Sequence, residues 1–131
     1  MKKGVNVIIM QDRKALVLKR SSSSKFSPNL WDLPGGKVEP KENLKEAVVR
    51  EAKEETGLEV KPKNNYFYIH YYPDNSTREN AEMAIYAFET ELIGGKVKLS
   101  QEHSDFKWVS RSNWKELDYT SSVRMTLKRL F

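Results

Sequence analysis

Apolar and polar positions along the chain predict strands interleaved with helices. Two β-branched apolar runs, 5–10 and 15–19, are separated by four polar residues, which predicts a hairpin in a buried sheet. Further strands are predicted at 66–72, 81–92 and 106–109, and helices at 42–56, 113–117 and 121–130. Because hairpins alternate with helices, we expect an α/β fold in which a mixed sheet packs between helices.

Glycine, proline and small polar residues separate these segments. Residues 21–29 include four consecutive serines and predict a polar loop. Pro34-Gly35-Gly36 and Gly94-Gly95 predict turns, and Gly57 is the expected C-terminal cap of the helix over 42–56.

The size and composition predict one globular domain over residues 1–131. The chain contains 38% hydrophobic and 31% charged residues, a balance that excludes intrinsic disorder. It has no cysteine, which excludes disulfides, thiolate metal sites and a cysteine nucleophile. Its apolar runs are too short to span a bilayer, and its first residues lack a secretory pattern, so we expect a cytoplasmic protein.

Positive charge is concentrated near the N-terminus. The first thirty residues hold seven Lys or Arg and one Asp, a net charge of +6, whereas the net charge of the whole chain is +5. A basic segment can bind a polyanion such as nucleic acid or a nucleotide phosphate, but scattered lysines can equally belong to a solvated surface. Composition alone does not decide between these interpretations.

The predicted helix over 42–56 carries acidic residues on its buried side. At about 100° per residue, its apolar stripe comprises Leu44, Ala47, Val48 and Ala52. Glu51 and Glu55 fall within about 20° of Leu44, and Glu54 lies at the edge of the same arc. Three inward carboxylates repel one another and lose hydration, so the pattern favours a bound cation that neutralises them.

Oxygen ligands alone favour a hard divalent ion, so we expect Mg²⁺, with Mn²⁺ able to substitute. Arg50 lies one turn before Glu54 and one turn after Glu46, and can orient either acid by an ion pair. Because glycine has no Cβ, the backbone at Gly35 and Gly36 can approach an ion closely, and a carbonyl there can complete its coordination.

Residues 36–58 follow the pattern G-x5-E-x7-R-E-U-x-E-E-x-G-U, where U is apolar. This pattern is the Nudix box, so the sequence resembles the Nudix hydrolase family. Its invariant letters are all present, as Gly36, Glu42, Arg50, Glu51, Glu54, Glu55 and Gly57. The lead-in Trp31-Asp32-Leu33-Pro34-Gly35 and the later Glu102-His103-x-x-Phe106-x-Trp108-Val109 are also similar to segments of the family.

The resemblance implies an α/β/α sandwich that hydrolyses a nucleoside diphosphate linked to another group, with Mg²⁺ as cofactor. It implies that Glu51, Glu54 and Glu55 bind the metal, helped by a carbonyl of Gly35 or Gly36. Arg50 is then expected to orient Glu54, and Glu42 to support the loop or to reach an ion through water.

The resemblance leaves the catalytic base open, because family members differ in this residue. A box glutamate, Glu51 or Glu54, can activate the water, or an acid from a later loop can do so or bind a further ion. Glu102 best matches that later acid, with Glu79 and Glu82 as weaker candidates.

Several residues are candidates for substrate binding. Lys19 and Arg20 can contact phosphates, and Phe26, Trp31 and Tyr68 can stack on a base, although solvation and core packing are common alternatives for these residue types. His70 and His103 have no recognisable partner spacing and are interpreted as ordinary polar residues.

The segment over residues 33–39, Leu-Pro-Gly-Gly-Lys-Val-Glu, resembles the MutT-type branch of the family. This resemblance implies Mg²⁺-dependent cleavage of a nucleoside triphosphate or deoxynucleoside triphosphate, including oxidised forms such as 8-oxo-dGTP, to a nucleoside monophosphate and pyrophosphate. ADP-ribose, a nucleotide sugar or a dinucleoside polyphosphate are alternative substrates. A non-catalytic nucleotide- or RNA-binding module is the alternative class, which the complete set of glutamates disfavours. We expect no stable nucleic-acid partner, no membrane association, and leave a homodimer open.

Overall fold

The computed structural model describes residues 1–71 and 82–131 of the chain. Its elements, in order, are β1 (Lys2–Gln11), β2 (Lys14–Arg20), β3 (Trp31–Asp32), β4 (Gly35–Lys37), α1 (Leu44–Thr56), β5 (Leu58–Tyr71), β6 (Met83–Gly95), β7 (His103–Val109), the 3-10 helix η1 (Trp114–Glu116) and α2 (Ser121–Leu130).

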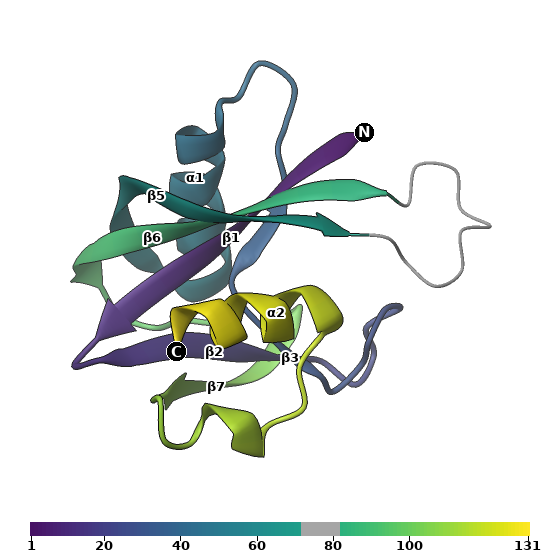
Figure 1. The fold of residues 1–131 in the computed structure, drawn as a ribbon, viewed down its shortest axis with the longest axis vertical. Coiled ribbons are helices and arrows are strands. Elements are labelled where there is room, and N and C mark those ends of the chain that lie inside the picture. Colours follow the sequence, from purple (N-terminus) through teal and green to yellow (C-terminus); the bar gives the residue numbers. More distant parts are fainter. Residues whose placement is uncertain (72–81) are drawn as a thin grey trace.

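The strands of the described residues form one mixed sheet that forks at β1 (Figure 1). Along one edge β1 pairs in parallel with β6, which pairs antiparallel with β5. The other edge of β1 pairs with two strands: β4 pairs with Gly4–Asn6, and β2 pairs only with Met10 and Gln11. The rest of β2 pairs instead with β3 and β7, so the sheet has a β4–β1–β6–β5 branch and a β3–β2–β7 branch.

The two α-helices cover opposite faces of this sheet (Figure 1). Val5, Val7 and Ile9 of β1 pack in one core cluster with the apolar stripe of α1. Ile8 points to the opposite face of the sheet. It packs in a second cluster with Val123 and Leu127 of α2 and with side chains that precede and follow α2 in the sequence. The predicted α/β fold with a mixed sheet between helices is therefore confirmed, and the period-2 alternation along β1 explains how one strand serves both cores.

The predicted hairpin over 5–10 and 15–19 is confirmed as β1 and β2. Asp12 and Arg13 form its two-residue turn, and both adopt left-handed backbone conformations with φ of 52° and 64°. Such conformations match the twist of the flanking strands in tight hairpins.

The turn predicted at Pro34-Gly35-Gly36 is wrong, because Gly35 and Gly36 belong to β4 and pair with Asn6 and Val5 of β1. Glycine is needed at these positions because other atoms pack closely against the backbone, and not because the chain reverses direction there. A Cβ on Gly35 would lie 2.1 Å from the carbonyl oxygen of Val5, and one on Gly36 would lie 2.4 Å from a carboxylate oxygen of Glu51.

The helix predicted at 42–56 begins two residues later, at Leu44. Asn43 caps it through a reciprocal capping box with Glu46, and this pair ends the preceding loop. Gly57 is the predicted C-terminal cap, with a left-handed φ of 74°.

Other boundaries also differ from the predicted ones. Strand β5 starts directly after Gly57, eight residues before the predicted strand, because its first half alternates polar residues with Leu58 and Val60. The predicted helix at 113–117 is only the 3-10 turn η1, and the glycines predicted as a turn at 94–95 end β6. The predicted turn after residue 72 lies outside the described residues.

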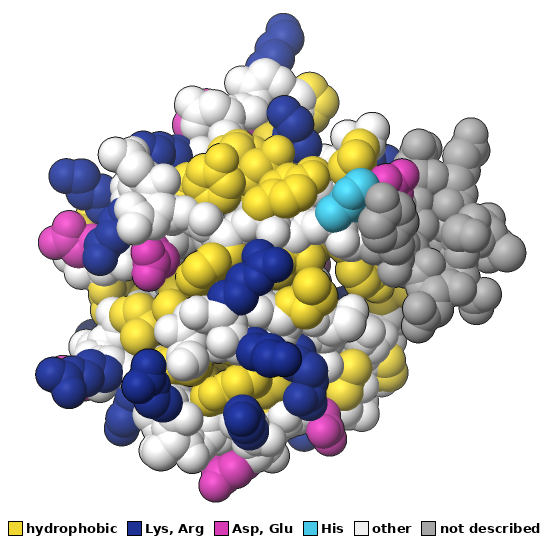
Figure 2. Space-filling view, viewed as in Figure 1, with side chains coloured by type: hydrophobic (Ala, Val, Ile, Leu, Met, Phe, Trp, Pro, Cys, Tyr) yellow, Lys and Arg dark blue, Asp and Glu magenta, His cyan; other side chains and the backbone are white. Residues whose placement is uncertain are grey.

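Basic side chains spread over the face of the molecule that carries α2 (Figure 2). Helix α2 contributes exposed Arg124, Lys128 and Arg129, so positive charge is not confined to the N-terminal segment. The helices in the described part of the chain are too short and polar to cross a bilayer.

Candidate active site

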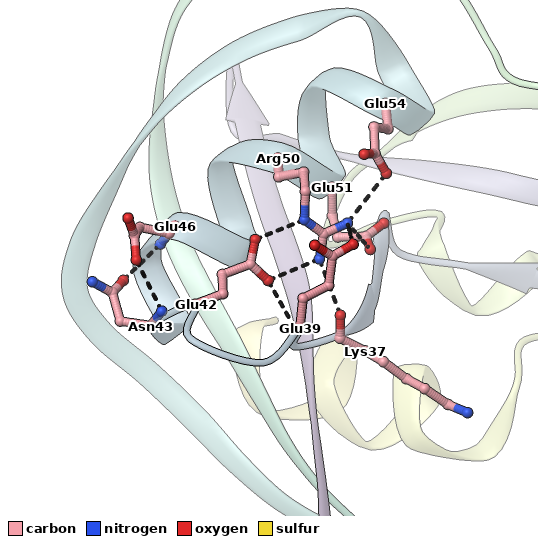
Figure 3. Close-up of polar contacts among 8 residues, drawn as sticks. All are labelled: Lys37, Glu39, Glu42, Asn43, Glu46, Arg50, Glu51 and Glu54. Atoms are coloured by element: carbon pink, nitrogen blue, oxygen red, sulfur yellow. Dashed lines mark hydrogen bonds and ion pairs between the residues drawn. The ribbon is translucent and has the colours of Figure 1, made fainter.

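Arg50 lies at the centre of the acidic side chains at the start of α1 (Figure 3). Its Nε and Nη2 atoms donate to the two carboxylate oxygens of Glu42, at 2.7 and 2.9 Å. Its Nη1 atom donates to Glu51 at 2.8 Å and to Glu54 at 3.2 Å, and Nη2 also reaches the carbonyl of Lys37 at 3.0 Å. One guanidinium therefore ties the loop before α1, strand β4 and two box glutamates together.

The pairing between Arg50 and Glu42 assigns Glu42 a supporting role. The hydrogen bonds from Arg50 lower the pKa of Glu42 to about 2, and the same contact raises the pKa of Arg50. Glu42 also accepts a hydrogen bond from the backbone N–H of Glu39, which closes the loop. Both carboxylate oxygens of Glu42 accept hydrogen bonds from Arg50, so Glu42 holds Arg50 in place. These contacts favour the expectation that Glu42 supports the loop.

Glu51 and Glu55 are buried on the inward face of α1, as the helical wheel predicts. The expectation of three inward carboxylates is wrong for Glu54, which is exposed because it lies at the edge of the apolar arc. Burial raises the pKa of Glu51, against the lowering effect of Arg50. Glu55 accepts a hydrogen bond from the backbone N–H of Gly35 at 2.8 Å. Its burial, with a smaller contribution from the neighbouring carboxyl of Glu102, raises the pKa of Glu55 to about 9.

These side chains line a hollow of about 660 Å³ between β4, the inward face of α1 and the 100–102 loop. The hollow contains the backbone of Gly35 and Gly36, and Glu102 faces the box glutamates across it. Residues that lie 47 to 51 positions apart in the sequence thus converge, as predicted for Glu102. Of the weaker candidates, Glu82 pairs with His70 on β5, and Glu79 lies outside the described residues.

The donor set of the hollow fits a divalent metal ion. Three carboxylates and the edge of a glycine strand supply the oxygen ligands that hard cations prefer. Burial raises the pKa of Glu55 and so disfavours its anionic form, which a cation bound beside it would stabilise. The assignment of Glu51, Glu54 and Glu55 as the residues that hold the ion stays a prediction.

Sequence reasoning missed two buried polar residues beside this hollow, Asp32 and His103. Asp32 is 8% exposed and accepts hydrogen bonds from Arg20 Nη1 and from His103 Nε2, both at 3.0 Å. The interpretation of His103 as an ordinary polar residue is wrong, because its side chain is only 2% exposed. The sequence does contain one indication of a buried polar residue here, because Asp32 lies within the apolar run 30–33.

Within the described part of the chain, none of the residues predicted to contact substrate is in the lining of the hollow. Arg20 is committed to Asp32, Ser24 and the carbonyl of Phe26, and so organises the 21–29 loop. Trp31 is 7% exposed and packs in the second core cluster. Of the predicted aromatic residues, Phe26 and Tyr68 have exposed rings, and the ring of Tyr68 packs edge-on against Tyr86. Their roles, and that of half-buried Lys19, stay predictions.

The fold and the arrangement of the box residues define a nucleotide-processing hydrolase of one family. The sequence pattern of the NUDIX domain matches residues 1–128, so the chain belongs to the Nudix family. It is a Nudix hydrolase, a class of enzymes that acts on nucleoside diphosphate derivatives and generally uses a divalent metal ion. Membership also decides against the alternative of a non-catalytic binding module.

Its relatives span more than one named activity. The chain is 30% identical to the nucleoside triphosphatase NudI of Enterobacter sp. (strain 638), over 91% of this chain and 89% of that protein. It is 34% identical to an ADP-ribose pyrophosphatase of Methanocaldococcus jannaschii, over 88% of this chain and 65% of that protein. In structure it is similar to the MutT protein of Methanosarcina mazei Go1, with a TM-score of 0.82 and 30% identity over 98% of this chain and 91% of that one.

The raised pKa of Glu55 predicts that the metal-free protein loses stability as the pH rises. Between the ordinary pKa of 4.5 and the folded value of about 9, the folded state binds a proton at Glu55 that the unfolded state has released. The free energy of unfolding is therefore expected to fall by about 1 kcal/mol per pH unit across this range because of Glu55 alone.

Urea unfolding with a chelator at pH 6, 7 and 8 measures this dependence. The Glu55→Gln variant is the matched comparison, since its amide does not titrate. The free energy of unfolding of Glu55→Gln is expected to fall less steeply with pH than that of wild type, by about 1 kcal/mol per pH unit. Equal slopes for the two proteins contradict the assignment of a neutral, buried Glu55.

Proposed function

We propose that this enzyme hydrolyses nucleoside triphosphates or their deoxy forms to a nucleoside monophosphate and pyrophosphate, with Mg²⁺ as the ion and Mn²⁺ able to substitute. The observation that carries this proposal is the hollow in which buried Glu51 and Glu55 and exposed Glu54 face a glycine strand. The similarity to a nucleoside triphosphatase along nearly the whole of both chains supports the choice of substrate.

In this proposal Glu51, Glu54 and Glu55 hold the metal, and Arg50 keeps the first two in place. When bound, Mg²⁺ offsets the negative charge of the phosphates and orients the attacking water. Glu55 is further oriented by the N–H of Gly35, so its position is set by β4 as well as by α1. Preorganisation of this kind lowers the cost of arranging charged groups during the reaction.

Glu54 is our candidate for the general base. Its side chain is 57% exposed and has the longest of the Arg50 hydrogen bonds to these glutamates, so an oxygen remains available to a water molecule. Glu51 is bound more closely by Arg50 and is largely removed from solvent. Glu102 is also exposed, lies in the 100–102 loop that lines the hollow, and is the second candidate.

ADP-ribose is a second candidate substrate, because the chain is also similar to an ADP-ribose pyrophosphatase. Both reactions break a phosphoanhydride bond, and they differ in what lies beyond the second phosphate. The exposed rings of Phe26 and Tyr68 are proposed to contact the base in either case, and Lys19 and Arg20 the phosphates.

A substrate panel with Mg²⁺ in ¹⁸O-labelled water tests the proposal. We expect nucleoside triphosphates to give nucleoside monophosphate and pyrophosphate, with one ¹⁸O atom in one of these two products, which ³¹P NMR and mass spectrometry detect. The panel includes 8-oxo-dGTP, ADP-ribose, a nucleotide sugar and a dinucleoside polyphosphate. Release of inorganic phosphate as the first product, or cleavage of ADP-ribose alone, contradicts the proposal.

Four further expectations stay predictions. They are the single domain over 1–131, the cytoplasmic location, the lack of a stable nucleic-acid partner, and the homodimer that the family resemblance leaves open.

A further inference from the structure

His103 is held beside the hollow in one defined orientation. It is the first residue of β7, and its Nε2 atom lies 3.0 Å from Oδ1 of Asp32. The other oxygen of Asp32 forms an ion pair with Arg20, which stabilises the carboxylate form. An ionised carboxylate only accepts hydrogen bonds, so the proton on the His103 ring is at Nε2.

In the neutral form of the ring, the Nδ1 atom of His103 then carries a lone pair. Nδ1 is fully buried and has no hydrogen-bond partner among the described residues. A buried polar atom without a partner costs about 1–3 kcal/mol, so such an atom calls for a ligand. In metalloproteins, a histidine whose other nitrogen donates to a carboxylate commonly ligates a metal ion.

The two nearest carboxylates complete a three-residue group. One ring nitrogen of His103 and one carboxylate oxygen from each of Glu55 and Glu102 all lie within 4.8 Å of one another. Ligand atoms about 2.1 Å from a common ion are at most about 4.2 Å apart, so a small rotation of exposed Glu102 brings the group to coordinating distance. The Glu55 and Glu102 carboxyls are already in contact with each other.

We propose that His103 Nδ1, Glu55 and Glu102 form a mixed nitrogen–oxygen metal position next to the all-oxygen position at Glu51 and Glu54. An imidazole ligand favours transition-metal ions such as Mn²⁺ over Mg²⁺. Asp32 is the positioning residue of this unit, because its contact with Nε2 leaves Nδ1 as the ring nitrogen available to an ion. The inference rests on the proposed function only in that both assign Glu55 as a metal ligand.

Binding of Mn²⁺ to the protein without substrate tests the inference. Electron spin echo envelope modulation detects imidazole ¹⁴N bound to Mn²⁺, and the chain contains two histidines, His70 and His103. We expect the imidazole modulation in wild type and in His70→Gln, in which His103 is the only histidine left. His70→Gln alters a partly exposed ring on β5 and leaves the buried residues intact.

The variant His103→Gln is expected to lose the modulation and to weaken Mn²⁺ binding by about tenfold or more, with a smaller change for Mg²⁺. Asp32→Asn is expected to weaken Mn²⁺ binding while the modulation remains, because an amide oxygen still accepts from Nε2. Imidazole modulation absent from Mn²⁺-saturated wild type, or lost in His70→Gln, overturns the inference even if His103→Gln fails to fold.

The outcomes separate this inference from the proposed function. Mn²⁺ binding without imidazole modulation, together with pyrophosphate release from the substrate panel, rejects the His103 ligand and retains the enzymatic proposal. Imidazole modulation with no cleavage of nucleoside triphosphates retains the ligand and rejects the substrate.

Discussion

Replacing Glu54 by glutamine is expected to lower kcat at least about a hundredfold and to change the free energy of unfolding by less than about 0.5 kcal/mol. The substitution keeps the size of the side chain but removes the charge that binds a cation and the basic oxygen that accepts a proton. Stability is spared because the side chain is 57% exposed and its described contact is a 3.2 Å bond from Arg50. Steady-state kinetics with saturating Mg²⁺ and urea unfolding measure the two quantities.

Glu59→Gln is the matched control for this variant. Glu59 is also an exposed glutamate, with a side chain 59% accessible, and it pairs with Lys53 away from the hollow. We expect Glu59→Gln to retain the wild-type kcat. Near wild-type turnover by Glu54→Gln contradicts the role of Glu54, and an equal loss in both variants shows that charge removal in general is responsible.

The two glycines of β4 are expected to respond to alanine in opposite ways. In Gly35→Ala the new Cβ would lie 2.1 Å from a backbone oxygen of Val5, which cannot move without breaking the pairing of β4 with β1. This variant is expected to lose about 3 kcal/mol of stability. In Gly36→Ala the Cβ meets only the carboxylate end of Glu51, which can rotate away.

Gly36→Ala is therefore expected to fold with little loss of stability but to lose about a hundredfold in kcat, because a displaced Glu51 no longer supports the metal site. Gly94→Ala serves as the control, since its Cβ would have ordinary contact with Glu59 at 3.6 Å. Urea unfolding and steady-state kinetics on the three variants compare stability with turnover. Equal effects at Gly35 and Gly36 contradict this division of roles.

The sequence predicted best where one local pattern determines the structure. The wheel over α1 placed Glu51 and Glu55 inward correctly because helical periodicity depends on neighbouring residues alone. The same is true of the β1–β2 hairpin and of the Gly57 cap. The Nudix box, which is a local pattern, also predicted that Arg50 and the glutamates lie together.

The sequence failed where the partner is distant along the chain. Gly35 and Gly36 have the composition of a turn, and only the approach of β1 and Glu51 shows that they form a strand. Asp32 and His103 are 71 residues apart, so no spacing rule connects them. Their pairing follows from β3 and β7 both lying against β2, which is a property of the sheet.

The fork of the sheet at β1 has a mechanical consequence for the enzyme. Residues 33 and 34 cross from one branch, which holds Asp32 and His103, to the other, where β4 positions Glu55 through the N–H of Gly35. The N–H of Val7 pins this crossing by donating to the carbonyl of Pro34 at 2.7 Å. A cation shared by Glu55 and His103 would therefore join the two branches of the sheet a second time, beside the covalent crossing at residues 33 and 34.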